Sequence, residues 1–558
     1  MRAMLLTATA TATAAVASAV LTPAVLTAGP PSASVPASAS GAPGTVPASM
    51  RAPVRASARA CSGTPSDFDG DGRADLAVAA PYAAVGGRPR AGSVTVLYGL
   101  RTERLLTQDD PGVPGEAETG DAFGSALAAG DFDGDRCADL AVGVSEEDRP
   151  GPGADGRGVV QIFHGSPGGL RPGEVIDARD VGRRRGPDRF GAALTAGDLD
   201  GDGDDELVVG IPGLGGGAVG VYGLGGRGPY ALTQRSGWVG QEEETTDQFG
   251  AVLTAGDFDG DGRDEIAAGA PGDTVTRKGQ GSVTVLDVRR RRALRLTQDS
   301  PGITGRAEAW DGFGAALATG DFNADGRDDL AVGAPGEGLT DGQRAMDYGD
   351  GTVVTVHGSP RGLRGAAAEA WSQRGLKGTP RYFDRFGAAL AAGDLNGDGD
   401  DELVVGIPGE NAVQVLAGTR SGGLTKRNDL LIRGGAAGDV KEDVKEDVEE
   451  DAAGTTGGDT EEAAEGAIEG SAEGSAEGSA EGSAEGAAGG NGGGFGSALA
   501  VLPGRRLVVA APGADRLVLL RGSVREGAYP GVRPATARTL TAGAGLSLFG
   551  YALTGRSG

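Results

Sequence analysis

Short apolar segments recur along the chain, with turn residues between them. The pair Phe-Gly opens one kind of segment and is followed by a small apolar run such as A-A-L-T-A-G. A second apolar run ends in a Gly-x-Pro-like turn. A third alternates, as in S-V-T-V-L-Y at 93–98, and a weaker fourth follows, as in R-L-L-T-Q at 104–108. Period-two alternation and short apolar runs bounded by turns are typical of β-strands, so the pattern predicts four strands per repeat.

This unit recurs seven times, with most copies roughly 60 residues apart. The Phe-Gly pairs begin at Phe123, Phe190, Phe249, Phe313, Phe386, Phe495 and Phe549. The turns after the second run contain Pro81, Pro212, Pro271, Pro335, Pro408 and Pro512, with Ser145 in place of Pro in the second repeat. Four strands in a repeat of this length fit one blade of a propeller. We therefore predict an all-β fold, a seven-bladed β-propeller.

The repeats are out of phase with the ends of the chain. The first Asp-rich loop, at Asp67, has no Phe-Gly run before it, and the last Phe-Gly run, at Phe549, has no loop after it. Joined head to tail, the two fragments complete one blade. Because closure removes unpaired sheet edges, we predict that the C-terminal strand is the innermost strand of the blade whose other strands start near Leu76.

Composition and charge narrow the class of protein. Of 558 residues, 105 are Gly and only 4% are aromatic, which disfavours a large helical enzyme. The net charge of −27 argues against nucleic-acid binding, since that needs a basic face. Residues 436–494 hold seventeen acidic residues and two lysines, with four S-A-E-G units. We interpret this segment as a disordered insertion. It arose by neutral repeat expansion, or it is a functional tail that binds basic partners or Ca²⁺.

The N-terminus predicts export. Residues 1–28 carry one positive charge and an Ala/Thr/Val/Leu run, the pattern of a signal peptide, with a membrane anchor as the alternative. Residues 29–60 are an Ala/Pro/Ser-rich segment and predict a disordered linker. No later segment is apolar enough to span a bilayer. We expect a secreted, extracellular monomer with no transmembrane segment after signal cleavage.

The repeated unit resembles the FG-GAP repeat of integrin α-subunit head domains, in a secreted bacterial type of chain. The resemblance covers residues 61–558 apart from the insertion. It implies a nine-residue calcium loop, with side-chain ligands at positions 1, 3, 5 and 9 and the carbonyl of position 7. The EF-hand alternative fails because its twelfth position, always Glu there, holds only Val or Ala here, beginning with Val78.

By this resemblance each Asp-rich loop supplies four side-chain ligands. They are Asp67, Asp69, Asp71 and Asp75; Asp131, Asp133, Asp135 and Asp139; Asp198, Asp200, Asp202 and Glu206; Asp257, Asp259, Asp261 and Glu265; Asp321, Asn323, Asp325 and Asp329; Asp394, Asn396, Asp398 and Glu402. Arg136 replaces the glycine at position 6 of the second loop, where a positive φ would be strained. We expect five Ca²⁺ sites. The loop at Asp131 is a sixth site only if Arg136 tolerates the positive φ.

Two cysteines, Cys61 and Cys137, are compatible with one disulfide that pins the N-terminus to the second loop, or with two unpaired thiols. His164 and His357 occupy equivalent places at the end of the third strand, and we interpret both as packing residues. No catalytic constellation is visible, so we predict a protein that is not an enzyme.

Three functions stay open at this point. The resemblance implies an adhesion or protein-binding module, whose ligand loops leave the Gly-x-Pro turns on the face opposite the calcium loops. A carbohydrate-binding propeller is the alternative, with Tyr82, Tyr348 and Trp371 as scattered aromatic candidates. The third is a hydrolase-associated protein, because the repeat also accompanies hydrolase domains. The partner is therefore an extracellular protein or a glycan of unknown identity.

Overall fold

The computed structural model describes residues 61–148, 157–182, 188–213, 215–224, 227–338, 349–420, 422–434, 440–442, 494–522, 532–541 and residue 553. All of them belong to one unit of the chain, residues 57–558. The predicted signal peptide and linker lie outside the described residues, as does the predicted insertion apart from 440–442 and 494.

The apolar runs form the predicted strands. Within the described residues they build seven antiparallel sheets, here called blades 1 to 7. Their strands are β1 (Leu76–Ala80), β2 (Ser93–Tyr98) and β3 (Thr102–Leu106); β4 (Phe123–Gly130), β5 (Asp139–Val144), β6 (Val159–His164) and β7 (Arg171–Asp177); β8 (Ala193–Gly197), β9 (Glu206–Ile211), β10 (Ala218–Tyr222) and β11 (Tyr230–Leu232); β12 (Val252–Gly256), β13 (Glu265–Ala270), β14 (Ser282–Asp287) and β15 (Arg292–Leu296); β16 (Ala316–Gly320), β17 (Asp329–Ala334), β18 (Thr352–Val356) and β19 (Glu369–Trp371); β20 (Ala389–Gly393), β21 (Glu402–Ile407), β22 (Ala412–Ala417), β23 (Thr425–Gly434) and β24 (Val440–Glu442); β25 (Leu499–Leu502), β26 (Arg506–Ala511), β27 (Arg516–Gly522) and β28 (Val532–Thr541). Helix in this part of the chain is limited to three-residue 3-10 turns.

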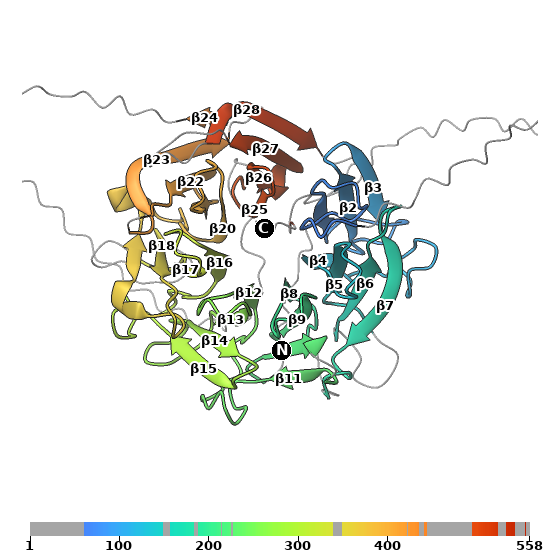
Figure 1. The fold of residues 1–558 in the computed structure, drawn as a ribbon, viewed down its shortest axis with the longest axis horizontal. Helices are drawn as coiled ribbons and strands as arrows, with labels where there is room; N and C mark the ends of the chain where they lie inside the picture. Colours follow the sequence, from blue (N-terminus) through green and yellow to red (C-terminus); the bar gives the residue numbers. More distant parts are fainter. Residues whose placement is uncertain are drawn as a thin grey trace, which may run out of the picture. The chain divides into compact units, whose positions relative to one another are not determined.

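The seven blades stand in a ring, with β4, β8, β12, β16, β20 and β25 nearest its centre (Figure 1). Seven clusters of buried apolar side chains fill the seven seams between neighbouring blades. The strands of each blade follow one another in the order of the chain. The predicted seven-bladed β-propeller is confirmed.

The recurrent Phe-Gly pair has a packing role that explains its spacing. Six of its phenylalanines are buried in the seams, at 0–1% exposure: Phe123, Phe190, Phe249, Phe313, Phe386 and Phe495. The glycine that follows has a positive φ, 83° at Gly250 and 92° at Gly314. A Cβ there would lie 2.6 Å and 2.7 Å from a backbone carbonyl of the preceding blade. Only glycine therefore permits this close approach of one blade to the next.

The first and last blades meet and close the ring. Leu76 and Val78 of β1 share a buried cluster with Val508 and Leu517 of blade 7, and Leu553 packs against it. Leu553 also forms an antiparallel bridge with Val78. This bridge lies where the sequence places the innermost strand of blade 1; the rest of 549–558 lies outside the described residues.

Blade 6 extends further than the sequence predicts. Residues Val440–Glu442, which the sequence analysis assigns to the disordered insertion, form β24 and pair with β23 at Ile432–Gly434. The boundary at residue 436 is therefore too early for these three residues.

Candidate metal-binding loops

The six Asp-rich loops occupy the same place in blades 1 to 6. Loops 2 to 6 follow directly on the glycine that closes the innermost strand and end on the first residue of the second strand, and loop 1 ends one residue before β1. The six loops are loop 1 (67–75), loop 2 (131–139), loop 3 (198–206), loop 4 (257–265), loop 5 (321–329) and loop 6 (394–402). In blade 7 the connection is the short turn at 503–505, Pro-Gly-Arg, which has no carboxylate.

The position-1 carboxylate organises each loop. In loop 3, Asp198 accepts hydrogen bonds from the amides of Gly201 (2.6 Å), Asp202 (3.2 Å) and Gly203 (3.0 Å). Equivalent bonds to the amides of positions 5 and 6 occur at Asp67, Asp131, Asp257 and Asp321. The chain therefore curls around this carboxylate and brings positions 3, 5 and 9 close to it.

The position-9 carboxylate is buried because it lies at the start of a buried strand. In loop 1, Asp75 accepts from the amides of Phe68 (2.8 Å) and Gly99 (2.6 Å), and so joins the loop to the end of β2. Burial raises the pKa of Glu206 to about 8 and that of Glu402 to about 9. Without a cation these side chains resist ionisation in their places.

The position-3 side chains carry oxygens that no group in the described residues satisfies. The Oδ1 atoms of Asp200, Asp259 and Asn323 are buried and have no hydrogen-bond partner there. Buried polar atoms are normally paired, so three such oxygens at one position of three loops call for a common explanation. Carboxylate oxygens of Asp198, Asp200 and Glu206 lie within 4.8 Å of one another, as do those of Asp257, Asp259 and Glu265. Each of these two sets can hold one ion.

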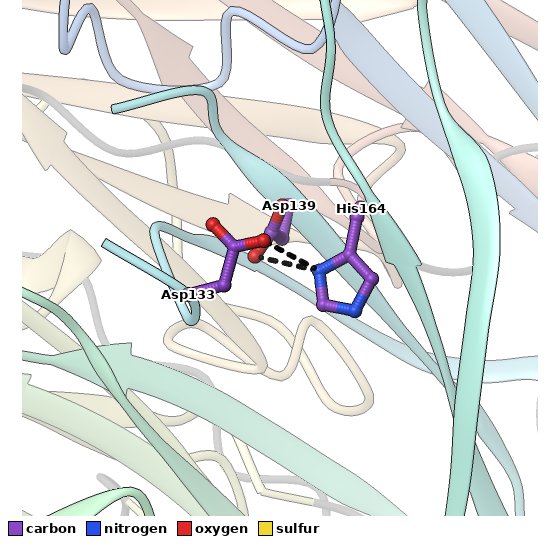
Figure 2. A group of neighbouring side chains, drawn as sticks. All are labelled: Asp133, Asp139 and His164. Atoms are coloured by element: carbon purple, nitrogen blue, oxygen red, sulfur yellow. Dashed lines mark hydrogen bonds and ion pairs between the residues drawn. The ribbon is translucent and has the colours of Figure 1, made fainter. Parts of the chain in front are cut away.

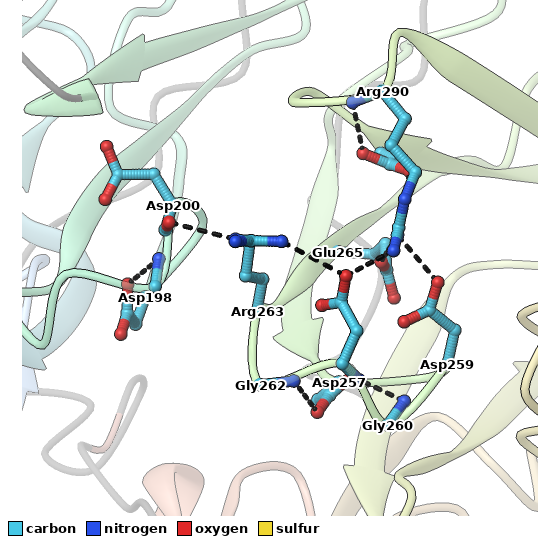
Figure 3. Close-up of polar contacts among 12 residues, drawn as sticks. Asp198, Asp200, Asp257, Asp259, Gly260, Gly262, Arg263, Glu265 and Arg290 are labelled. Carbon is cyan, nitrogen blue, oxygen red and sulfur yellow. Dashed lines mark hydrogen bonds and ion pairs between the residues drawn. The ribbon is translucent and has the colours of Figure 1, made fainter.

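Loop 4 contains a cation of its own that the sequence analysis missed. The guanidinium of Arg290, just after β14, lies 2.7 Å from Asp259 Oδ2 (Figure 3). It also pairs with Asp261. Its backbone amide is held by Asp287 at 2.7 Å. A metal ion in loop 4 must therefore displace this guanidinium. No position in the nine-residue loop signals this contact, because Arg290 lies in the turn between β14 and β15.

Loop 2 closes like the others although it lacks the position-6 glycine. Arg136 takes up the positive φ, 69°, and its amide donates to Asp131 at 2.8 Å. The amides of Gly134 and Asp135 also donate to Asp131, at 2.9 and 3.1 Å. The strain expected at Arg136 thus leaves the shape of the loop intact.

Both histidines face loop carboxylates, so their interpretation as packing residues is wrong. The Nδ1 atom of His357 lies 2.8 Å from Asp329 Oδ2 of loop 5. The Nδ1 atom of His164 lies 3.3 Å from Asp139 Oδ2 and 3.4 Å from Asp133 Oδ2 of loop 2. Both histidines come at the end of a third strand, which lies beside position 9 of the loop. This place in the repeat was the sequence signal that could have indicated a contact with the loop carboxylates.

Position 8 links neighbouring loops and is not a ligand position. Asp205 accepts from the amide of Asp131 in the preceding blade at 3.0 Å, and Asp328 and Asp401 accept equivalently, at 2.9 and 3.0 Å. Loops 1 and 2 have alanine at this position. Between these two blades the structure has a disulfide, Cys61–Cys137, with the Cα atoms 5.0 Å apart.

A family model described as FG-GAP repeat matches residues 62–97, 123–163, 190–223, 249–286, 313–356 and 386–423. Each match contains one Asp-rich loop with the strands around it. The chain is a propeller of FG-GAP repeats. Among its relatives, integrin alpha pat-2 of Caenorhabditis briggsae is 32% identical over 238 residues, 39% of this chain and 18% of the integrin. The match thus spans less than a fifth of that integrin chain.

Two further proteins match parts or most of this chain. Phosphatidylinositol-glycan-specific phospholipase D of Bos taurus is 27% identical over 387 residues, 62% of this FG-GAP chain and 42% of the phospholipase. The solved structure of the periplasmic gluconolactonase of Pseudomonas aeruginosa matches with a TM-score of 0.38 and 15% identity over 85% of this chain and 98% of its own. Within the part of this chain that the structure describes, no helix is long and apolar enough to cross a membrane.

Proposed function

We propose that the chain is a secreted calcium-binding propeller in which the ions hold the blade hairpins together. The observation that carries the proposal is the set of buried position-3 oxygens without hydrogen-bond partners in loops 3, 4 and 5. Ca²⁺ takes six to eight oxygen ligands at about 2.3–2.6 Å, and the donors of loops 3, 4 and 6 are carboxylate, amide and carbonyl oxygens. Loop 1 has the same oxygen donors, and loop 5 has them beside the imidazole of His357, 2.8 Å from Asp329 Oδ2, which makes five sites.

A calorimetric titration of the full chain with Ca²⁺ is expected to give five bound ions. Asp200→Ala removes the unpaired oxygen of loop 3 and should lower the number by one. The matched control is Asp204→Ala in the same loop, because Asp204 is exposed at position 7, where only the backbone carbonyl is a ligand. Absence of binding at millimolar Ca²⁺, or equal losses in both variants, would contradict the proposal.

We infer further that the chain acts as an adhesion or protein-binding module through the end opposite the calcium loops. Trp310, Tyr382 and Phe383 are exposed by 37%, 55% and 49%. They flank one connection, that between β17 and β18: Gly336 donates to Asp311 O at 3.0 Å and Arg385 donates to Gly349 O at 3.3 Å. Exposed aromatic side chains on loops of a rigid scaffold suit recognition.

These aromatics also support the second candidate, carbohydrate binding, since sugar rings stack on exposed aromatic rings. They differ from the aromatics that the sequence suggested. Trp371 is half-buried and donates to Thr355 Oγ1 at 3.2 Å, Tyr82 lies beneath Arg90, and Tyr348 lies outside the described residues. Exposure, which the sequence does not show, separates the two sets.

The double variant Tyr382→Ala/Phe383→Ala is expected to weaken partner binding at least tenfold without changing thermal stability. Leu105→Ala is the control, because Leu105 is 48% exposed on β3, the outer strand of another blade. The wild-type chain and both variants should be applied to a glycan array and to a panel of immobilised extracellular proteins. Binding that the double variant leaves unchanged would exclude this end as the recognition surface.

A further inference from the structure

Loop 2, like loop 5, has a histidine beside its carboxylates, and in loop 2 that histidine faces two of them. His164, the last residue of β6, turns its Nδ1 atom toward Asp133 and Asp139, at 3.4 and 3.3 Å (Figure 2). These three donor atoms lie within 4.8 Å of one another, so a single ion can contact all of them. At the end of the third strand, blades 1, 3 and 4 have Tyr98, Tyr222 and Asp287, which offer only oxygen. Blade 5 has His357, whose Nδ1 lies 2.8 Å from Asp329 of loop 5, but position 3 of that loop is the amide Asn323 and not a carboxylate.

The other ring nitrogen of His164 is already engaged. Its Nε2 atom lies 2.9 Å from Oε2 of Glu174, a residue of β7. Since a carboxylate accepts, Nε2 carries the proton in this contact. The lone pair of a neutral ring is then at Nδ1 and points at two carboxylate oxygens. That arrangement is repulsive unless a proton or a metal ion lies between them.

A carboxylate that accepts from the distal nitrogen of a histidine is the usual support of a metal-bound imidazole. It fixes the ring orientation and the tautomer and makes the proximal nitrogen a better donor. Loop 2 is also the loop anchored by a disulfide, through Cys137, and by the bond from Gly63 N to Arg136 O at 3.0 Å. The donors of this loop are therefore held in place from two sides.

We propose that loop 2 binds a divalent transition metal of the Zn²⁺ class, with His164, Asp133 and Asp139 as ligands and Glu174 as a positioning residue. Imidazole suits zinc and its neighbours, whereas Ca²⁺ prefers oxygen donors. The proposal rests on the proposed function only in treating the Asp-rich loops as metal sites. It gives one propeller two kinds of metal site, five for calcium and one for a nitrogen-binding metal.

The test uses the full chain in excess Ca²⁺, titrated with Zn²⁺ by calorimetry and then dialysed for metal analysis. We expect one equivalent of Zn²⁺ that calcium does not displace. His164→Ala should weaken Zn²⁺ binding more than a hundredfold, and Glu174→Gln should weaken it about 10- to 100-fold. His357→Ala, the change at the only other histidine, should retain the bound Zn²⁺.

The outcomes separate this proposal from the calcium proposal. Absence of a Zn²⁺ equivalent in the wild-type chain, or its persistence in His164→Ala, overturns the loop 2 assignment, and Nδ1 then carries a proton. One Zn²⁺ lost only in His164→Ala upholds the assignment even if calcium fails to bind elsewhere. A melting midpoint of His164→Ala within about 2 °C of wild type, in excess Ca²⁺, shows that lost Zn²⁺ binding does not reflect unfolding.

Discussion

Removal of calcium with EGTA is expected to lower the melting midpoint of the full chain by roughly 5–10 °C. At a free Ca²⁺ concentration tenfold above Kd, each site stabilises the folded state by about 1.4 kcal/mol, so five sites contribute about 7 kcal/mol. A propeller of this size loses about 1 °C of melting midpoint per kcal/mol. Calorimetric scans in Ca²⁺, in EGTA and after calcium is restored measure the effect. If EGTA leaves the melting midpoint unchanged, calcium does not stabilise the folded chain.

The effect of EGTA should also depend on pH. In the metal-free protein, burial raises the pKa of Glu206 and Glu265 to about 8 and that of Glu402 to about 9. Between the ordinary pKa of about 4.3 and these values, the folded chain holds protons that the unfolded chain has released. The stability of the metal-free protein is therefore greatest at the acid end of this window and falls as pH rises to about 9.

Calcium replaces these protons, so the ion stabilises most where the protons are absent. The EGTA-induced shift at pH 8 should exceed the shift at pH 5.5. Scans in matched ionic strength at both pH values measure the two shifts. An equal or larger shift at pH 5.5 would show that the position-9 carboxylates do not bind the ion. Loop 4 should contribute least, because Arg290 already neutralises Asp259 and Asp261 when calcium is absent.

The fold was predictable because its determinants are local and repeated. Each Phe-Gly pair among the described residues marks a seam, since only a glycine allows the backbone contact seen at Gly250 and Gly314. The same holds for many hydrogen bonds of the loop carboxylates, which run to amides two to seven residues away, such as those between Asp67 and Gly72 and between Asp75 and Phe68. Periodicity and short-range geometry therefore fix the blade count and the arrangement of each loop.

Contacts that cross strands could not be predicted in this way. Arg290 reaches Asp259 across 31 residues, and His164 reaches Asp139 across 25. Whether a third-strand side chain turns toward the loop depends on the register of that strand and on the rotamer, neither of which the repeat specifies. Exposure of Trp310 and Phe383 depends on how the connections fold over them. These are the features that distinguish one loop or one face from another, and so they bear most on function.

Deletion of residues 549–558 is expected to lower the melting midpoint by about 10 °C or more and to promote aggregation. The described contact behind this expectation is the bridge between Leu553 and Val78, beside the apolar cluster that joins blades 7 and 1. Without the bridge from Leu553, the edge of β1 that faces away from β2 loses its described partner, although all five residues of β1 are buried. Such edges recruit other chains, and the seam loses apolar cover.

A point variant separates loss of the seam from the shortening of the chain. Leu553→Asp places a charge in a half-buried apolar position and should cost about 2–4 kcal/mol. Leu105→Asp introduces the same charge in the same blade on the outer strand β3, where the side chain is 48% exposed, and should cost less than about 0.5 kcal/mol. If the deletion or Leu553→Asp melts like wild type, the C-terminal strand does not close the ring. Blades 1 and 7 would then meet through their shared apolar cluster alone.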